Sequence, residues 1–137
     1  MMDGAGRGIQ QIERDGDVVL ARQMARQLAE EIGFSRAEQA LIATAVSELA
    51  RNIVNYAGSG MIAVTKNLRG RNIGLTITAT DDGPGIADLD AAMVDGFSTG
   101  NSLGLGLPGT RRIMDEFEIS SPPGNGLTVI ATKWAFE

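Results

Sequence analysis

The sequence predicts an α+β fold in which a mixed, mainly antiparallel sheet carries helices on one face. Helical periodicity dominates roughly residues 17–56, whereas period-two alternation and turn-forming residues dominate most of the remaining chain. Helices that precede hairpin-linked strands are typical of a two-layer α+β domain. The length of 137 residues fits one domain, spanning 1–137.

The first elements expected are a short strand and a long helix. Residues 8–13 alternate weakly between apolar and polar side chains and predict the strand. Residues 17–32 carry apolar side chains at helical spacing. Asp17 is placed to cap this helix, and Gly33 is placed to end it.

A second helix has the clearest signals in the chain. Ser35 and Glu38 have the spacing of a capping box, in which each side chain accepts a hydrogen bond from the other residue's backbone amide. Gly58 is expected to end the helix. Its apolar side is formed by residues at helical spacing, namely Ile42, Val46, Leu49, Ile53 and Tyr56.

The second half is expected to contain two hairpins separated by an irregular stretch and a third helix. The irregular stretch, 82–106, is rich in glycine, and the helix is expected over 107–116 with Pro108 in its first turn. The expected strands are 61–68, 73–81, 117–121 and 127–134.

Composition excludes several classes of site. The chain has no Cys and no His, which excludes disulfides, thiolate or imidazole metal sites, a Ser-His-Asp triad and a phosphohistidine carrier. Acid–base chemistry must therefore use carboxylates, Lys or Tyr. A formal net charge of −5 disfavours binding to nucleic acid, and it means that a nucleotide would need a divalent cation and backbone amides.

The sequence predicts a cytoplasmic location. No apolar run approaches the roughly 18 residues that a membrane-spanning helix needs. Residues 1–14 are polar and lack the apolar region of a signal peptide.

Four polar residues, Thr44, Glu48, Asn52 and Asn55, follow one track along the edge of the second helix's apolar side. A carboxylate and two amides at the rim of a core are expected in the wall of a pocket. Polar residues also flank buried stripes commonly, so a solvated helix edge stays open as the alternative.

Glycines mark two loops. Asp81 ends a predicted strand and is followed by Gly83 and Gly85, where a ligand can approach the backbone closely or the chain simply turns. Gly104 and Gly106 precede the third helix, whose first amides suit phosphate oxygens, although a plain flexible loop fits as well. The letters also fit a dinucleotide fingerprint, but the run follows a loop instead of a strand, and too little chain remains for a Rossmann unit.

In combination, these motifs resemble the GHKL ATPase superfamily over most of the chain. Within it, the chain is similar to the small stand-alone serine kinases that regulate sigma factors by partner switching, including the anti-sigma-factor kinases and the stressosome switch kinases. The runs that carry this resemblance are 47–53, 82–86, 95–99, 106–109, 114–117 and 131–134.

The resemblance implies a Bergerat sandwich that binds ATP between its helices and a lid formed by residues 87–103. It implies that Glu48 is the catalytic base and that Asn52 holds Mg²⁺ against the phosphates. Arg51 is a candidate for compensating phosphate charge, because that lid contains no Lys or Arg. The implied adenine contacts are Asp81, Gly83, Gly85 and Ile86, and the implied phosphate contacts are Gly104, Leu105, Gly106 and Leu107.

The last hairpin departs from the pattern of these relatives. Leu127 occupies the place where they usually have Thr, and Thr128 follows one position later. A shift of one residue in a strand moves a side chain to the other face of the sheet. The adenine contact carried over to Thr128 is therefore the weakest member of the expected site.

The resemblance implies an ATP-dependent serine/threonine kinase that phosphorylates STAS-domain scaffold or antagonist proteins and, once released, activates a protein phosphatase. An anti-sigma or switch binding module with a vestigial nucleotide site is the main alternative, and an ATPase without a protein substrate is a further one. Glu48, Asn52 and Asp81 together favour an enzyme, because a module that only binds has no need for a carboxylate at a half-buried site.

Overall fold

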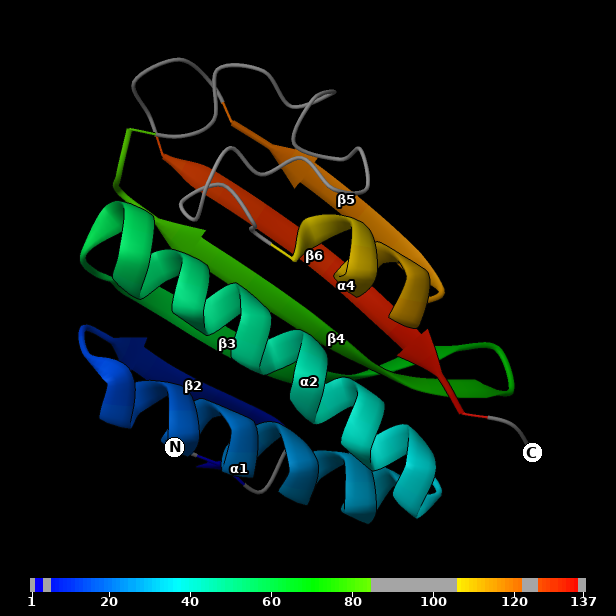
Figure 1. Cartoon of the computed structure of the whole chain (residues 1–137). Helices are drawn as coiled ribbons and strands as arrows, with labels where there is room; N and C mark the ends of the chain where they lie inside the picture. The colour runs from blue at the N-terminus through cyan, green and yellow to red at the C-terminus, as the bar shows by residue number, and fades with distance from the viewer. Residues whose placement is uncertain (1, 4–5, 85–105, 122–125, 136–137) are drawn as a thin grey trace.

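The computed structural model describes residues 2–3, 6–84, 106–121 and 126–135. In these ranges the helices cover one face of a six-stranded sheet and leave the other face open (Figure 1). The helical elements are α1 (Asp15–Ile32), α2 (Arg36–Asn52), the π-helical turn η1 (Ile53–Ala57) and α4 (Leu107–Ile113). The two-layer α+β fold expected from the sequence is confirmed.

The strands are β1 (Met2–Asp3), β2 (Arg7–Ile12), β3 (Gly60–Arg69), β4 (Asn72–Asp81), β5 (Glu116–Ser120) and β6 (Leu127–Trp134). Their order across the sheet is β1-β2-β3-β4-β6-β5. Every pairing among these described strands is antiparallel. Both expected hairpins are confirmed, and β1 is an additional edge strand that the sequence did not predict.

The core lies between the sheet and the two long helices. Val64, Ile77 and Ala131 oppose one another across β3, β4 and β6 and are fully buried beneath the helices. Leu28 of α1 and Ile42 of α2 are also buried in this layer. The described residues include no helix that is long and apolar enough to cross a bilayer.

The start of α1 differs from the prediction. The helix begins at Asp15, and Asp17 lies inside its first turn. The Asp17 carboxylate reaches back and accepts hydrogen bonds from the backbone amides of Glu13 and Arg14, at 2.9 and 3.2 Å. Asp17 thus occupies the position of the acidic partner in a capping box instead of the cap itself. Gly33 ends the helix as predicted, with φ of 110°.

The capping box of α2 is confirmed. The Ser35 amide donates to Glu38 Oε1 at 3.0 Å, and the Glu38 amide donates to Ser35 Oγ at 3.1 Å. The helical segment ends at Gly58 as predicted, but the α-helical pattern stops at Asn52 and the last turn is a π-turn that the sequence did not predict. The Gly58 amide closes this turn on the Ile53 carbonyl oxygen, five residues earlier, at 2.8 Å.

The third helix is shorter than the expected 107–116. It ends at Ile113, and Met114 is extended. The cause is competition from β6, because the Asp115 amide bonds to the Thr132 carbonyl and the Lys133 ammonium bonds to the Ile113 carbonyl. Residues that could have continued the helix therefore begin β5.

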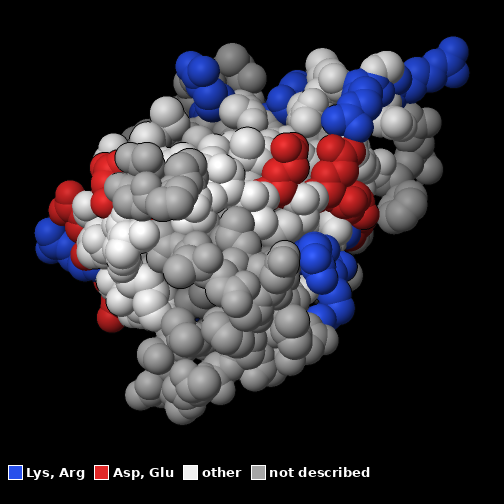
Figure 2. Space-filling view, turned by 90° about the horizontal axis from the view of Figure 1, so that it is seen from above, with Lys and Arg blue, Asp and Glu red and all other residues white. Residues whose placement is uncertain are grey.

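Basic and acidic side chains lie next to one another on the described surface when the molecule is seen from above (Figure 2). At the start of β5, Glu116 accepts hydrogen bonds from both terminal nitrogens of Arg69, at 2.8 and 3.3 Å, and from Trp134 Nε1 at 2.8 Å. The Arg69 guanidinium lies 4.7 Å from the centroid of the Trp134 ring. These contacts lower the pKa of the Glu116 carboxyl below its ordinary value. The hydrogen bonds from Arg69 have the largest effect, followed by the hydrogen bond from Trp134.

Glu116→Gln is expected to destabilise the protein slightly at neutral pH and not at all in strong acid. The pKa of Glu116 is lower in the folded state than in the unfolded state. The ionised carboxylate therefore stabilises the fold fully at pH values above its ordinary pKa of 4.5, and this stabilisation is lost as the pH falls through the lowered pKa. Thermal unfolding followed by circular dichroism across this range measures the effect. Glu118→Gln, a change to an exposed glutamate on the same strand, is the control. A wild-type advantage that persists unchanged in strong acid would contradict the prediction.

Candidate functional site

Glu48 of α2 lies against Gly106, the residue that immediately precedes α4. The side chain of Glu48 is half-buried. A Cβ atom placed on Gly106 would lie 3.1 Å from Glu48 Cδ and 3.2 Å from Cγ, and it would overlap Oε2. Two residues assigned from sequence to one site, on elements far apart in the chain, are thus in contact.

The backbone at Gly106 is suited to this close approach. Gly106 has φ of 71°, in the left-handed region that favours glycine. Its carbonyl oxygen accepts hydrogen bonds from both the backbone amide and the hydroxyl of Thr110, each at 2.9 Å, and Thr110 is buried. The turn is therefore held firmly against Glu48. Leu107 follows with its side chain fully buried, so that only its backbone can contribute to phosphate binding.

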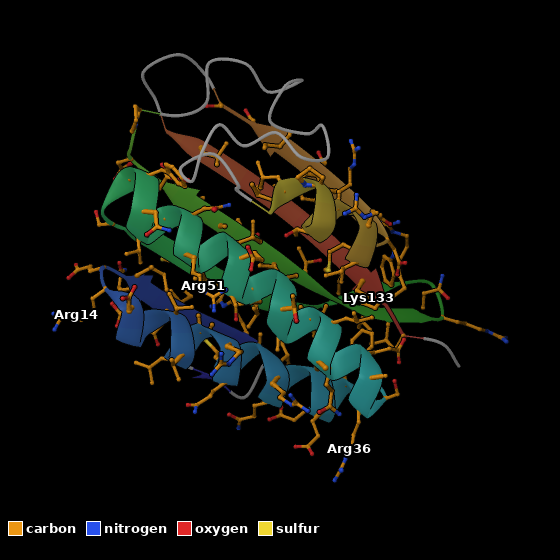
Figure 3. All side chains as sticks on the ribbon, in the orientation of Figure 1. Arg14, Arg36, Arg51 and Lys133 are labelled. Carbon is orange, nitrogen blue, oxygen red and sulfur yellow. The ribbon has the colours of Figure 1, made fainter. Side chains whose placement is uncertain are left out.

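Arg51 forms an ion pair with Glu48, one turn further along the same helix. Arg51 Nη1 lies 3.1 Å from Glu48 Oε1, and the two side chains are 52% and 35% exposed. Figure 3 shows Arg51 on α2. The sequence suggested a phosphate contact for Arg51, whereas an acid and a base three residues apart on a helix are also a recognised signal for an ion pair.

Asn52 is half-buried at the last position of α2, where the π-turn begins. It stands one helical turn from Glu48, as the spacing predicted. Thr44 is exposed, and its hydroxyl donates to the Ala40 carbonyl at 3.0 Å. Asn55 lies within η1, where α-helical spacing no longer applies. The expected polar track therefore holds as far as Asn52 and not beyond it.

Asp81 ends β4 and belongs to a tight turn. Its Oδ1 accepts a hydrogen bond from the Gly83 amide at 2.9 Å, which fixes the direction of the carboxyl group. A Cβ atom on Gly83 would lie 2.7 Å from Cβ of Ala57, so this loop packs directly on η1. The π-turn that follows Asn52 and the loop that follows Asp81 are consequently neighbours.

The register of β6 separates Thr128 from this group. Alternate residues of β4 (Leu75, Ile77, Ala79) are buried under the helices, and Asp81 continues that series. Leu127 opposes Asp81, whereas Thr128 opposes Thr80, and directly opposed residues share a face of the sheet. Thr128 therefore points to the open face, and Leu127 occupies the face that carries Asp81.

Several expected contacts lie outside the described residues. These are Gly85, Ile86, Gly104, Leu105 and the lid, 87–103.

The donor set fits a magnesium nucleotide better than a bare metal ion. Within the ranges that the structure describes, no group of three or more acidic side chains gathers to hold a metal. One amide oxygen, from Asn52, suits a Mg²⁺ ion that takes its other ligands from phosphates and water. The absence of a side chain at position 106 lets the Glu48 carboxylate lie against the backbone at the start of α4, where a Cβ would overlap Oε2.

Comparison with known proteins identifies the family. Residues 13–133 match the family described as "Histidine kinase-like ATPase domain". The chain belongs to this family. The GHKL resemblance inferred from the sequence is thereby confirmed.

Relatives within this family include kinases and anti-sigma factors. The chain is 50% identical over 123 residues to the serine/threonine-protein kinase RsbT of Bacillus subtilis (strain 168), covering 90% of this chain and 92% of RsbT. It is 33% identical over 120 residues to the anti-sigma F factor of Thermoanaerobacter sp. (strain X514), covering 83% and 82%. The enzyme class expected from the sequence, a serine/threonine kinase, is confirmed at the level of the family.

A solved structure supports the fold alone. The catalytic domain of the histidine kinase ThkA superposes with a TM-score of 0.51 at 13% identity, covering 92% of this chain and 95% of that domain.

Proposed function

We propose that this chain is a cytoplasmic, Mg²⁺- and ATP-dependent serine/threonine kinase of a partner-switching pathway. In this proposal it phosphorylates STAS-domain scaffold or antagonist proteins and then activates a protein phosphatase. The observation that carries the proposal is the contact of the Glu48 carboxylate with the Gly106 turn. This contact supports a role for Glu48 as the base, because the carboxylate lies beside the backbone at the start of a helix. The chain is also 50% identical to a serine/threonine kinase.

In the reaction, the hydroxyl oxygen of a substrate Ser or Thr forms a bond to the γ-phosphorus of ATP while the bond to the β–γ bridging oxygen breaks. Glu48 accepts the hydroxyl proton and orients the hydroxyl oxygen for in-line attack. Mg²⁺, when bound, neutralises charge on the phosphates. Asn52 would hold that ion through its amide oxygen, and the backbone at Gly106 and Leu107 would donate to phosphate oxygens.

Asp81 would select the base of the nucleotide. Its carboxylate accepts hydrogen bonds, and the exocyclic amine of adenine donates them. The hydrogen bond from the Gly83 amide holds one carboxyl oxygen in place, so the group is oriented before a ligand arrives. Leu127 on the same face offers adenine an apolar contact where relatives usually carry Thr.

A binding module with a vestigial nucleotide site is the second candidate, because the chain also resembles anti-sigma F factors. Such a module would act by holding a partner and would have no need for catalysis. The Glu48–Gly106 contact favours the kinase, since a half-buried carboxylate against a glycine turn has no evident use in a surface that only binds proteins.

Labelled phosphate distinguishes the two candidates. The chain is incubated with γ-labelled ATP, Mg²⁺ and individual STAS-domain proteins, and labelled residues are then mapped. The kinase hypothesis expects label on Ser or Thr of at least one of these proteins and none after removal of Mg²⁺ by a chelator. Binding of a STAS partner or of a sigma factor without any transfer of label would favour the binding module.

A further inference from the structure

The two carboxylate oxygens of Glu48 have different neighbours. Oε1 lies 3.1 Å from Arg51 Nη1. Oε2 is the oxygen that faces Gly106, since it is the atom that a Cβ on that residue would overlap. The carboxylate is thus held on one side by a cation and directed on the other toward the turn that begins α4.

We infer that Arg51 is a positioning residue for phosphoryl transfer, which acts by holding Oε1 of Glu48 so that Oε2 faces the Gly106 turn. This inference rests on the proposed function. Arg51 would then act by orienting the Glu48 carboxylate, and it would not contact the phosphates as the sequence suggested.

The terminal torsion of a glutamate is broad, so packing of its carbons does not by itself fix the carboxylate plane. A guanidinium hydrogen bond to one oxygen removes that freedom. Phosphoryl transfer depends on alignment of the attacking oxygen with the γ-phosphorus, and a misdirected base loses rate even where substrate binds normally.

The solvent exposure of the Arg51–Glu48 ion pair allows a positioning role to be distinguished from a role in folding. With side chains 52% and 35% exposed, the ion pair contributes little to folding, because water and salt screen it. Removing Arg51 should therefore change the rate of transfer far more than the stability of the fold.

The test compares Arg51→Met and Arg51→Lys with Arg36→Met. Arg36 is an exposed arginine in the first turn of the same helix, and Figure 3 shows the two arginines toward opposite ends of α2. For Arg51→Met, kcat for transfer to the protein substrate is expected to fall about tenfold or more. This loss is smaller than the loss expected when the general base itself is removed. The dissociation constant of Mg-ATP and the unfolding temperature should stay at wild-type values. Arg51→Lys should recover much of the rate, and Arg36→Met should match wild type.

A double-mutant cycle shows whether Arg51 acts through Glu48. In a Glu48→Gln background, Arg51→Met should cause no further loss in the residual rate, because the group that it positions is gone. Equal additional losses in both backgrounds would overturn the inference. Weakened Mg-ATP binding with an unchanged kcat would also overturn it and would assign Arg51 to the phosphates.

The outcomes separate this inference from the proposed function. If wild-type protein transfers phosphate and Arg51→Met transfers it equally well, the positioning role fails while the kinase assignment stands. If the wild-type chain neither phosphorylates a protein nor hydrolyses ATP, both fail together.

Discussion

Replacing Glu48 with Gln is expected to reduce phosphoryl transfer by about 10²- to 10⁴-fold while Mg-ATP binds nearly as in wild type. Gln has almost the same shape, so the packing of its carbons against Gly106 is kept. An amide cannot accept the proton of the attacking hydroxyl. The ion pair with Arg51 is also lost, but that pair is too exposed to support the fold. Single-turnover transfer of labelled phosphate and calorimetry with Mg-ATP measure the two quantities separately.

Asp81→Asn is the matched carboxylate-to-amide change in the same site. It is expected to show the opposite pattern, with weaker ATP binding, because an amide that presents its nitrogen to adenine loses the hydrogen bond that the carboxylate accepts. Loss of nucleotide binding in Glu48→Gln would mean that Glu48 shapes the pocket and does not serve as the base. Unchanged affinity in Asp81→Asn would remove Asp81 from the adenine contact.

The parts of the fold that sequence predicted are those decided by local chemistry. The Ser35–Glu38 capping box forms as expected because both of its hydrogen bonds lie within one turn. The strands on either side of Gly70 pair because their alternation places one apolar side on the core. Gly33 ends α1 because it supplies the left-handed conformation that stops a helix.

The parts that sequence missed are decided by contacts between distant segments. The π-turn places Ile53 in the core against the start of β3, where a Cβ on Gly60 would lie 2.8 Å from Ile53 Cγ2. Helical spacing predicted that Ile53 is buried, but it did not predict the π-turn that brings Ile53 against β3. Likewise, α4 ends at Ile113 because β6 supplies hydrogen-bond partners, and a helix pattern read alone continues past that point.

The candidate site also contains residues that local spacing predicted and contacts that depend on distant segments. Helical spacing alone put Glu48 and Asn52 on one side of α2. The approach of Gly106 to Glu48 follows from no local pattern, because α4 reaches α2 only through the packing of the whole helical layer. Resemblance to a family supplied that expectation, and the register of β6 then showed which carried-over residue, Thr128, faces away.

Gly106→Ala is expected to abolish phosphoryl transfer while leaving the rest of the fold intact. The substitution has two costs. A left-handed backbone with a side chain costs on the order of 1–2 kcal/mol, and the new methyl group would overlap Oε2 of Glu48. The backbone cannot easily move away, because Thr110 holds the Gly106 carbonyl with two hydrogen bonds. The side chain of Glu48 must therefore move, and the base loses its alignment. Transfer of labelled phosphate and circular dichroism measure activity and fold.

Gly70→Ala is the control that carries the backbone strain without the steric overlap. Gly70 has a similar φ of 62°, in the turn between β3 and β4, but a Cβ there would have no atom within 4 Å. It should therefore show the backbone strain as a small loss of stability and retain full kinase activity. If Gly106→Ala lost only as much stability as Gly70→Ala and still transferred phosphate at the wild-type rate, the contact between Glu48 and the Gly106 turn would have no part in catalysis. Residues other than Gly106 would then have to hold the Glu48 carboxylate in its catalytic orientation.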